Sequence, residues 1–399
     1  MSKIYLVITP FFPEPNMFRG PYVLDQVKAI QRNSDFDVIV MKPFNAYKKE
    51  EFDYEIDGIN VYRFKDYTLP SNIFPNGYID NLSSHSLIRK LKQININVKD
   101  IQYCHCHVNE TSKFTTYLKK INPAIKVIIQ HHGFDVLNIT LGIFANYQWH
   151  KKWCISYGKK LCMKADLHVG VSYKTLEHLK QYATKEIKNE YVLYNGIDKS
   201  LFHPQSPTIK NTIYTIGCVG NFWPLKDQMT LIKAIEFLST KRTINIKVIF
   251  IGSGETYNNC IKYIEDHHLE SYFEFKKEVM HEQLVQFYQS LDLFVLPSYY
   301  EAFGCVYAEA YYCGVNFIAV EGQGISEVIA DEDKKKWLIK KGDYQTLAHL
   351  IAENIDTPQK QKLNVDLAYI IHSGFISGYQ NRYGDNLKPP TNVYHRMTA

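Results

Sequence analysis

The sequence predicts an α/β protein made of two successive halves, each with a parallel sheet. Short apolar segments of strand length alternate with longer amphipathic segments, a pattern typical of βαβ units. This pattern starts at residues 4–9 and starts again at residues 215–219. Between the halves, residues 198–210 contain Pro204 and Pro207, which interrupt regular structure. We therefore expect two domains joined by a linker at this segment.

In the first half, the helix expected at residues 23–31 shows how the elements are recognised. Val23, Leu24, Val27 and Ile30 recur at helical spacing and define one apolar face. Strands are expected at residues 4–9, 37–41, 59–64, 127–130, 167–171 and 191–194, and further helices at residues 83–93 and 174–181.

The second half repeats this order of elements. Strands are expected at residues 215–219, 246–251 and 293–297, and helices at residues 227–238 and 282–290. Because the pattern restarts, we expect two Rossmann-like domains, at residues 1–198 and 199–370, that face each other across a cleft. Residues 371–399 are expected to form a C-terminal helix and tail that pack back toward the first domain.

Composition excludes several classes of protein. Of the 399 residues, 45% are hydrophobic and 22% are charged, as in ordinary globular proteins. No apolar run approaches the about 20 residues that cross a bilayer, and the N-terminus lacks the features of a signal peptide, so we expect a cytoplasmic protein. Residues 1–200 carry 27 Lys and Arg against 19 Asp and Glu. This basic half suits an anionic partner such as phospholipid, a polyprenyl phosphate or nucleic acid, or is an ordinary solvated surface.

The cysteines do not predict a disulfide framework or a metal site. The chain has eight, without the spacing of a disulfide scaffold. The run Cys104-His105-Cys106-His107 resembles a metal-binding motif at first sight. Neighbouring residues in a strand point to opposite faces, however, and no second cluster completes a tetrahedron. We therefore expect no metal.

The most informative segment is residues 293–329. A buried strand leads into a loop with Glu301, and a helix begins near Cys305. The N-terminus of such a helix has unpaired N–H groups and the positive end of a dipole, which suit a diphosphate. Gly304 permits close approach of a ligand to the backbone. Glu301 and Glu309 flank this position and suit hydrogen bonds to sugar and ribose hydroxyls.

This segment closely resembles the retaining glycosyltransferases of family 4. The resemblance includes Glu301, seven intervening residues, Glu309 and a glycine-rich segment with Glu327. It implies the GT-B fold of two facing Rossmann-like domains, a nucleoside-diphosphate sugar as donor, UDP- or GDP-linked, and no metal or other cofactor. The resemblance implies that Glu301 positions the donor sugar and Glu309 the ribose.

A second segment, residues 218–228, is similar to the donor-phosphate loop of the same family. Lys226 matches the family's lysine and would neutralise the leaving diphosphate. Asn221 follows Gly220 where the family has an arginine, so either the phosphates are held less tightly or another residue supplies the charge. The donor contacts that the resemblance implies are Gly20, Gly220, Asn221, Lys226, Glu301, Ala302, Phe303, Gly304, Cys305 and Glu309.

The first half carries three further family-like features. Gly20, before the first helix, matches the loop that covers the donor diphosphate from the acceptor-binding domain. His107 ends an HxH segment, and His132 and Asp135 belong to a match to the family's HGxD. The resemblance implies that His132 acts in catalysis with Lys226 and Glu301, and places His107 and Asp135 on the acceptor side. The alternative for His132 is a histidine satisfied by a backbone carbonyl.

Residues 149–160 alternate aromatic and basic side chains. Trp149 and Trp153 lie four residues apart among several lysines. Such a helix either lies on an anionic membrane surface, at the inner face of the membrane, or has its tryptophans in the core.

The resemblance implies a retaining glycosyltransferase of the hexosyltransferase type. Its acceptor would be a glycan or a polyprenyl-diphosphate-linked oligosaccharide in bacterial surface-polysaccharide synthesis, such as capsule, lipopolysaccharide or exopolysaccharide. A glycoside hydrolase would also use two carboxylates but needs no phosphate clamp. A catalytically silent nucleotide-sugar-binding relative is the remaining alternative, and no nucleic-acid-binding module is recognised.

Overall fold

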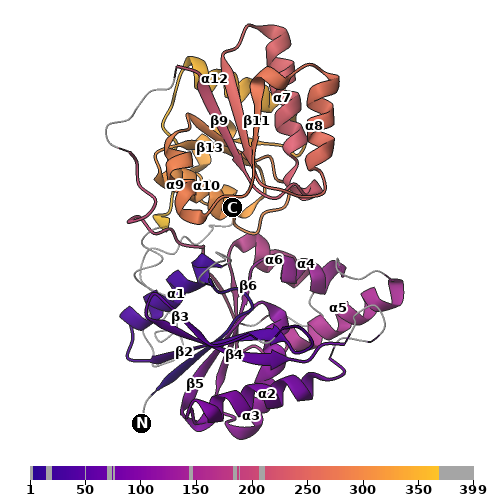
Figure 1. Cartoon of the computed structure of the whole chain (residues 1–399), viewed down its shortest axis with the longest axis vertical. Helices are drawn as coiled ribbons and strands as arrows, with labels where there is room; N and C mark the ends of the chain where they lie inside the picture. Colours follow the sequence, from indigo (N-terminus) through magenta and orange to yellow (C-terminus); the bar gives the residue numbers. More distant parts are fainter. Residues whose placement is uncertain are drawn as a thin grey trace, which may run out of the picture. The chain divides into compact units, whose positions relative to one another are not determined.

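The computed structural model describes residues 3–14, 20–49, 51–69, 74, 77–142, 147–182, 187, 189–205 and 212–367 (Figure 1). These residues divide into two compact units. Unit 1 contains the described residues up to Gly170 together with His178–Gly196, and unit 2 contains Val171–Glu177 and Ile197–Leu367. The helix and tail expected at residues 371–399 lie outside the described residues.

The described part of unit 1 is built on an eight-stranded sheet with the spatial order β3-β4-β2-β1-β5-β6-β7-β8. The strands are β1 (Ile4–Ile8), β2 (Asp37–Asn45), β3 (Tyr54–Ile56), β4 (Ile59–Asp66), β5 (Ile101–His107), β6 (Lys126–His131), β7 (Leu167–Gly170) and β8 (Glu190–Val192). Neighbouring strands are parallel except β3 and β4, which form an antiparallel hairpin. Asp57 and Gly58 at its turn both have positive φ, as tight hairpins require.

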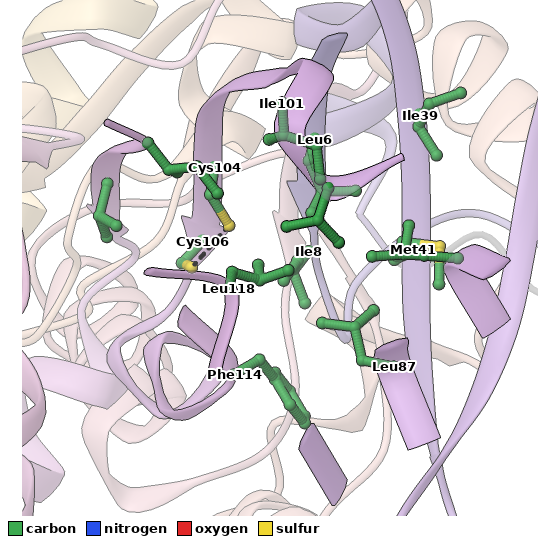
Figure 2. Packing of buried hydrophobic residues seen from close by; sticks show 14 of the residues in the cluster. Leu6, Ile8, Ile39, Met41, Leu87, Ile101, Cys104, Cys106, Phe114 and Leu118 are labelled. Carbon is green, nitrogen blue, oxygen red and sulfur yellow. Dashed lines mark hydrogen bonds between the residues drawn. The ribbon is translucent and has the colours of Figure 1, made fainter. Parts of the chain in front are cut away.

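Helices cover both faces of this sheet, and β1 shows why. Tyr5 and Val7 belong to the core cluster that also contains residues of α1, such as Val23. Leu6 and Ile8 point to the opposite face, where they pack with residues of β2, β5 and α2 (Figure 2). Alternate residues of a strand face opposite sides, so a strand covered on both sides is apolar throughout.

The helices of unit 1 are α1 (Pro21–Arg32), α2 (Asp80–Gln93), α3 (Thr115–Ile121), α4 (Phe134–Leu141) and α5 (Gln148–Cys162), with the 3₁₀ helices η1 (Val98–Asp100) and η2 (Asn109–Phe114). Helix α6 (Tyr173–Tyr182) begins in unit 2 and ends in unit 1. The helices predicted at residues 23–31, 83–93 and 174–181 correspond to α1, α2 and α6, whereas α3 and α4 were not predicted.

The described part of unit 2 has a six-stranded, fully parallel sheet with the order β11-β10-β9-β12-β13-β14. The strands are β9 (Tyr214–Val219), β10 (Ile246–Ile251), β11 (Phe273–Lys276), β12 (Leu293–Val295), β13 (Asn316–Val320) and β14 (Leu338–Ile339). The helices are η3 (Pro224–Lys226), α7 (Gln228–Lys241), α8 (Tyr257–Asp266), η4 (Glu270–Tyr272), α9 (His281–Gln289), α10 (Cys305–Tyr312), η5 (Gly324–Glu327), η6 (Asp331–Asp333), α11 (Lys334–Trp337) and α12 (Tyr344–Asp356). Figure 1 shows α7 and α8 beside the strands of this sheet.

Two predictions about surfaces are tested by the structure. Trp149 and Trp153 of α5 are 49% and 46% exposed, so the alternative that they belong to the core is wrong. Among the described residues, no helix has the length and apolar character needed to cross a membrane.

Candidate functional site

In unit 2, the structure brings Lys226 and Glu301 together. Lys226 is the last residue of η3, and its Nζ forms an ion pair with the Glu301 carboxylate. The surrounding loops are joined as well, because the Tyr299 N–H and the Ser298 hydroxyl both donate to the Leu225 carbonyl at 3.0 Å. Lys226 remains 20% exposed and Glu301 11% exposed at their side chains. The pair is therefore ordered by the fold and still open to a ligand.

The loop after Glu301 leads into α10 in the way the sequence predicts. Gly304 is the N-cap residue, with a φ of 89°, and no side chain of the described residues caps the helix there. A Cβ at Gly304 would lie 2.6 Å from the Tyr307 ring, so both backbone angle and space require glycine. Cys305 begins the helix, while the neighbouring Phe303 is buried. The helix N-terminus beside Glu301 has the chemistry of an anion site.

A glycine-rich segment, residues 322–324, packs against the loop of residues 301–303 and forms hydrogen bonds with it. The Glu301 N–H donates to Oε1 of Gln323 at 2.8 Å, and the Gly324 N–H donates to the Glu301 carbonyl at 3.2 Å. A Cβ at Gly324 would lie 1.9 Å from the Ala302 carbonyl oxygen. Only glycine permits this approach, so the segment fixes the backbone of residues 301–303.

Glu309 occupies a different environment from Glu301. It is buried in the body of α10, where the Tyr288 hydroxyl of α9 donates to its Oε2 at 2.8 Å. Burial, followed by the nearby Glu309 carboxylate, raises the pKa of Tyr288 well above its usual value. Tyr288 therefore stays protonated and keeps donating to Glu309.

Gly220 and Asn221 lie where β9 ends. The Gly220 N–H donates to the Ile251 carbonyl at 3.0 Å, and the Asn221 carbonyl accepts from Nε2 of Gln228 at 3.1 Å. A Cβ at Gly220 would meet its nearest neighbour at 3.7 Å, an ordinary contact. Asn221 itself is exposed.

The structure also places at this site a lysine that the sequence reasoning missed. Lys174 in α6, within unit 2, contacts Oε1 of Gln323, and its Nζ lies 4.9 Å from the centroid of the Tyr300 ring. Glu327 accepts hydrogen bonds from the backbone N–H groups of Tyr173 and Lys174, each at 2.8 Å. Lys174 is far from residues 293–329 in the sequence, and no local pattern connects the two segments.

In unit 1, three of the predicted residues gather where β5 and β6 end. Nδ1 of His107, the last residue of β5, lies 3.0 Å from Nε2 of His132, which follows β6. The two rings are stacked with centroids 5.3 Å apart. Burial is the largest of the effects that lower the pKa of His132 to about 4. The histidine pair is therefore neutral near pH 7.

Asp135 organises the turn that carries His132. Its Oδ1 accepts from the N–H groups of His132 and Gly133 at 3.0 Å each. Its Oδ2 accepts from the Asn109 N–H at 3.3 Å and lies 2.8 Å from Nδ1 of His131. Burial alone would raise the pKa of Asp135, but these hydrogen bonds and the neighbouring His131 lower it. The carboxylate thus supports the turn from inside.

The histidine cluster extends behind these residues. His105 stacks on His107 with centroids 4.5 Å apart, and the Tyr5 hydroxyl lies 3.0 Å from Nδ1 of His105. Nε2 of His131 lies 3.1 Å from Nδ1 of His168. Burial lowers the pKa of both His105 and His168 to about 3. His105 and His168 are therefore neutral near pH 7 and lie behind this edge of the sheet.

Gly20 is the N-cap residue of α1, and the start of this helix lies near His132. Gly20 has a φ of 85°, and a Cβ there would lie 2.7 Å from the Phe11 carbonyl oxygen. Two residues later, the Tyr22 ring lies 5.1 Å from the His132 ring. The loop before α1 and the turn after β6 are thus neighbours within unit 1.

The run at residues 104–107 divides between the two faces of the sheet. Cys104 and Cys106 lie 3.9 Å apart, sulfur to sulfur, in the core cluster of Figure 2, whereas His105 and His107 join the histidine cluster. No grouping of three or more potential metal ligands is found among the residues that the structure describes.

Comparisons with known proteins agree with this architecture. Residues 200–368 match the family described as glycosyl transferases group 1. The chain is 24% identical over 244 residues to N-acetyl-alpha-D-glucosaminyl L-malate synthase of Bacillus anthracis, covering 59% of this chain and 60% of that protein. It is 25% identical over 167 residues to the capsular polysaccharide biosynthesis glycosyltransferase CapM of Staphylococcus aureus, covering 40% and 41%. These matches span about two fifths to three fifths of each relative's length.

Among solved structures, HepE of Anabaena in complex with UDP and glucose is similar over 92% of this chain and 94% of its own, with a TM-score of 0.65 and 18% identity. This likeness establishes the fold and confirms the expected pair of Rossmann-like domains. Residues 200–368 are therefore a glycosyl transferases group 1 domain, in a chain that has the GT-B fold.

Proposed function

We propose that this protein is a retaining, metal-independent glycosyltransferase. It transfers a hexose from a nucleoside-diphosphate sugar, UDP- or GDP-linked, to a hydroxyl of a glycan or of a polyprenyl-diphosphate-linked oligosaccharide. Its setting is the cytoplasmic stage of bacterial surface-polysaccharide synthesis. The similarity to CapM, a glycosyltransferase of capsular polysaccharide biosynthesis, supports this setting.

The observation that carries the proposal is the contact between Lys226 and Glu301 beside the N-terminus of α10. An ammonium group and uncapped helix N–H groups stabilise the negative charge that forms on a departing diphosphate. A carboxylate at the same place accepts hydrogen bonds from sugar hydroxyls. One side of the pair therefore serves the leaving group and the other the sugar.

In the proposed reaction, the bond between the sugar's anomeric carbon and the diphosphate oxygen breaks, and its electron pair leaves with the diphosphate. The acceptor hydroxyl attacks from the same face, so the anomeric configuration is retained. Its proton passes to the departing phosphate oxygen. Lys226 and the backbone of Gly304 and Cys305 stabilise the diphosphate, while Glu301 holds the sugar and Glu309 the ribose.

The family resemblance also assigns roles to residues of unit 1. His132, neutral and oriented by His107, contacts a sugar hydroxyl or the acceptor, and Asp135 holds its turn. Gly20 lets the backbone before α1 approach the donor diphosphate.

The direct test is release of nucleoside diphosphate from UDP- and GDP-sugars by purified protein, with EDTA present, followed by analysis of the product's anomeric configuration. We expect turnover that EDTA leaves unchanged and that K226M removes. A product with inverted configuration would contradict the retaining mechanism. Tight binding of a nucleotide sugar without any transfer would favour the silent nucleotide-sugar-binding alternative.

A membrane surface is the proposed peripheral partner. Trp149 and Trp153 expose nearly half of their surfaces on α5, a helix that also carries the exposed Lys152 and Lys160. Aromatic side chains beside lysines suit the headgroup region of an anionic bilayer.

Co-sedimentation with phosphatidylglycerol vesicles tests this partner. We expect binding that phosphatidylcholine vesicles do not support and that the double variant W149S/W153S loses. F52S, which removes an exposed aromatic elsewhere in unit 1, serves as the control. Equal binding by both variants would exclude this face.

A further inference from the structure

We propose that Lys174 is a second cation for the donor diphosphate and takes the place of the arginine that Asn221 replaces. This inference rests on the proposed function and adds a binding residue to the same site.

The position of Lys174 is fixed from two directions. Glu327 accepts the backbone N–H groups of Tyr173 and Lys174, so the first turn of α6 is tied to η5. At the other end of the side chain, Nζ contacts Oε1 of Gln323, the same oxygen that accepts the Glu301 N–H at 2.8 Å. The ammonium group therefore lies beside the loop that leads into α10.

The charges around the loop that leads into α10 favour binding of an anion. Glu301 forms the ion pair with Lys226 and also interacts electrostatically with Lys174, so one carboxylate serves two ammonium groups. The Glu327 charge is engaged by backbone N–H groups at a helix start. A diphosphate beside Glu301 would compensate the remaining positive charge of the two ammonium groups through charge-assisted hydrogen bonds.

Burial of Lys174 points the same way. Burial lowers the pKa of its ammonium group to about 8, against the opposing effects of Glu301 and Glu327. Holding a partly desolvated cation costs free energy unless an anion compensates it. Asn221, in contrast, is an exposed neutral amide at the end of β9. Lys174 therefore supplies a positive charge that the position of Asn221 lacks.

Calorimetric titration of UDP, GDP, uridine and guanosine into K174M, K174R and wild-type protein tests the inference. We expect K174M to bind the preferred diphosphate at least about tenfold more weakly, as loss of one charge-assisted hydrogen bond predicts, with nucleoside affinity unchanged. K174R should keep most of the affinity. K180M, on the same helix with its lysine paired to Glu190, is the matched control and should bind like wild type.

The outcomes separate the two levels of the argument. If wild-type protein binds neither UDP nor GDP, the proposed donor is wrong and this inference falls with it. If wild type binds and K174M binds equally well, only the role of Lys174 is wrong. A K174M variant that weakens nucleoside and diphosphate alike would show a general loss of structure and would also overturn the proposal. K174Q, checked for an unchanged unfolding midpoint without ligand, covers the case in which K174M fails to fold.

The pH dependence supplies a second readout. Deprotonation of Lys174 removes its charge, so wild-type affinity for the diphosphate should fall between pH 7 and pH 9. Glu301 and Glu327 are the charged groups that act on Lys174, and Lys226 is paired with Glu301. K174R, whose guanidinium stays charged, should lack this decline. An identical decline in K174R would assign the effect to another group.

Discussion

In unit 1 two histidines lie at the ends of neighbouring strands, whereas in unit 2 a lysine and a glutamate lie in the loops after two neighbouring strands. A ring nitrogen of His107, at the end of β5, lies 3.0 Å from a ring nitrogen of His132, which follows β6, and Lys226 and Glu301 form an ion pair after β9 and β12. Carboxyl ends of parallel strands are the usual place for ligands in both cases.

Burial explains the difference between the two edges. The histidines sit over a packed interior, where desolvation disfavours the charged ring. The lysine and glutamate retain some exposure and neutralise each other. The comparison shows how one architecture presents hydrogen-bonding dipoles on one unit and full charges on the other.

The largest expected effect is the loss of folding stability on acidification, and we expect it in unit 1 only. The folded-state pKa values of His105 and His168 are lowered to about 3 and that of His107 well below its usual value. The unfolded chain therefore binds more protons below about pH 6.5, and stability falls as pH falls, by about 1.4 kcal/mol per histidine between pH 7.5 and 5.5. Hydrogen exchange, corrected for intrinsic rates, should show β5 losing protection while β10 keeps it. Equal loss of protection in both strands would show that the buried histidines of unit 1 do not cause the loss of stability.

Removing Asp135 should destabilise unit 1 nearly as much. D135A leaves the buried N–H groups of His132, Gly133 and Asn109 without their acceptor, which costs about 3 kcal/mol. Urea unfolding measures the loss. D35A, which removes an exposed carboxylate paired with Lys3, is the control and should leave the transition unmoved. A D135A transition at the wild-type midpoint would show that the turn does not need the carboxylate.

Removing Lys226 should affect catalysis rather than stability. K226M eliminates the cation that faces the leaving group, so kcat for nucleoside-diphosphate release should fall about 100-fold or more. K241M, at the exposed end of α7, should turn over like wild type. Wild-type turnover by K226M would move the phosphate clamp elsewhere, with Lys174 as the next candidate.

Removing the Tyr288 hydroxyl should have the smallest effect. Y288F takes one donor from buried Glu309 and should lower the free energy of unfolding by about 1 kcal/mol. If Glu309 holds the ribose, KM for the donor should rise while kcat changes little. Y263F, which removes a hydroxyl bonded to Glu236 away from α10, is the matched control and should leave KM unchanged. A fall in kcat with constant KM would argue against the ribose contact.

Much of the fold could be predicted from local patterns. The strand expected at residues 246–251 coincides with β10, and the helix expected at residues 227–238 starts one residue before α7. The elements left out include very short strands, β14 with two residues and β3 with three, in which no periodicity can develop. They also include regular helices, α8 with 10 residues and α12 with 13.

The site was predicted in its chemistry more than in its contacts. Lys226, Glu301 and Gly304 were selected as one donor site, and the structure brings them together. The structure places the Asp135 carboxylate inside the turn of His132, while the acceptor-side role expected for Asp135 stays a prediction. No spacing rule connects Lys174 to Gln323, because their contact depends on segments far apart in the chain.

Local patterns in the sequence are enough to predict the α/β class, the repeat of the pattern in two halves, and which loops carry charged residues and glycines. These features are local, since periodicity and backbone preferences act over a few neighbouring residues. The interactions of Glu301 with Lys226 and Lys174 depend on the folded chain, and so does the burial that keeps the stacked His105 and His107 neutral. Pairing and desolvation arise when distant segments pack together, so they depend on the complete fold.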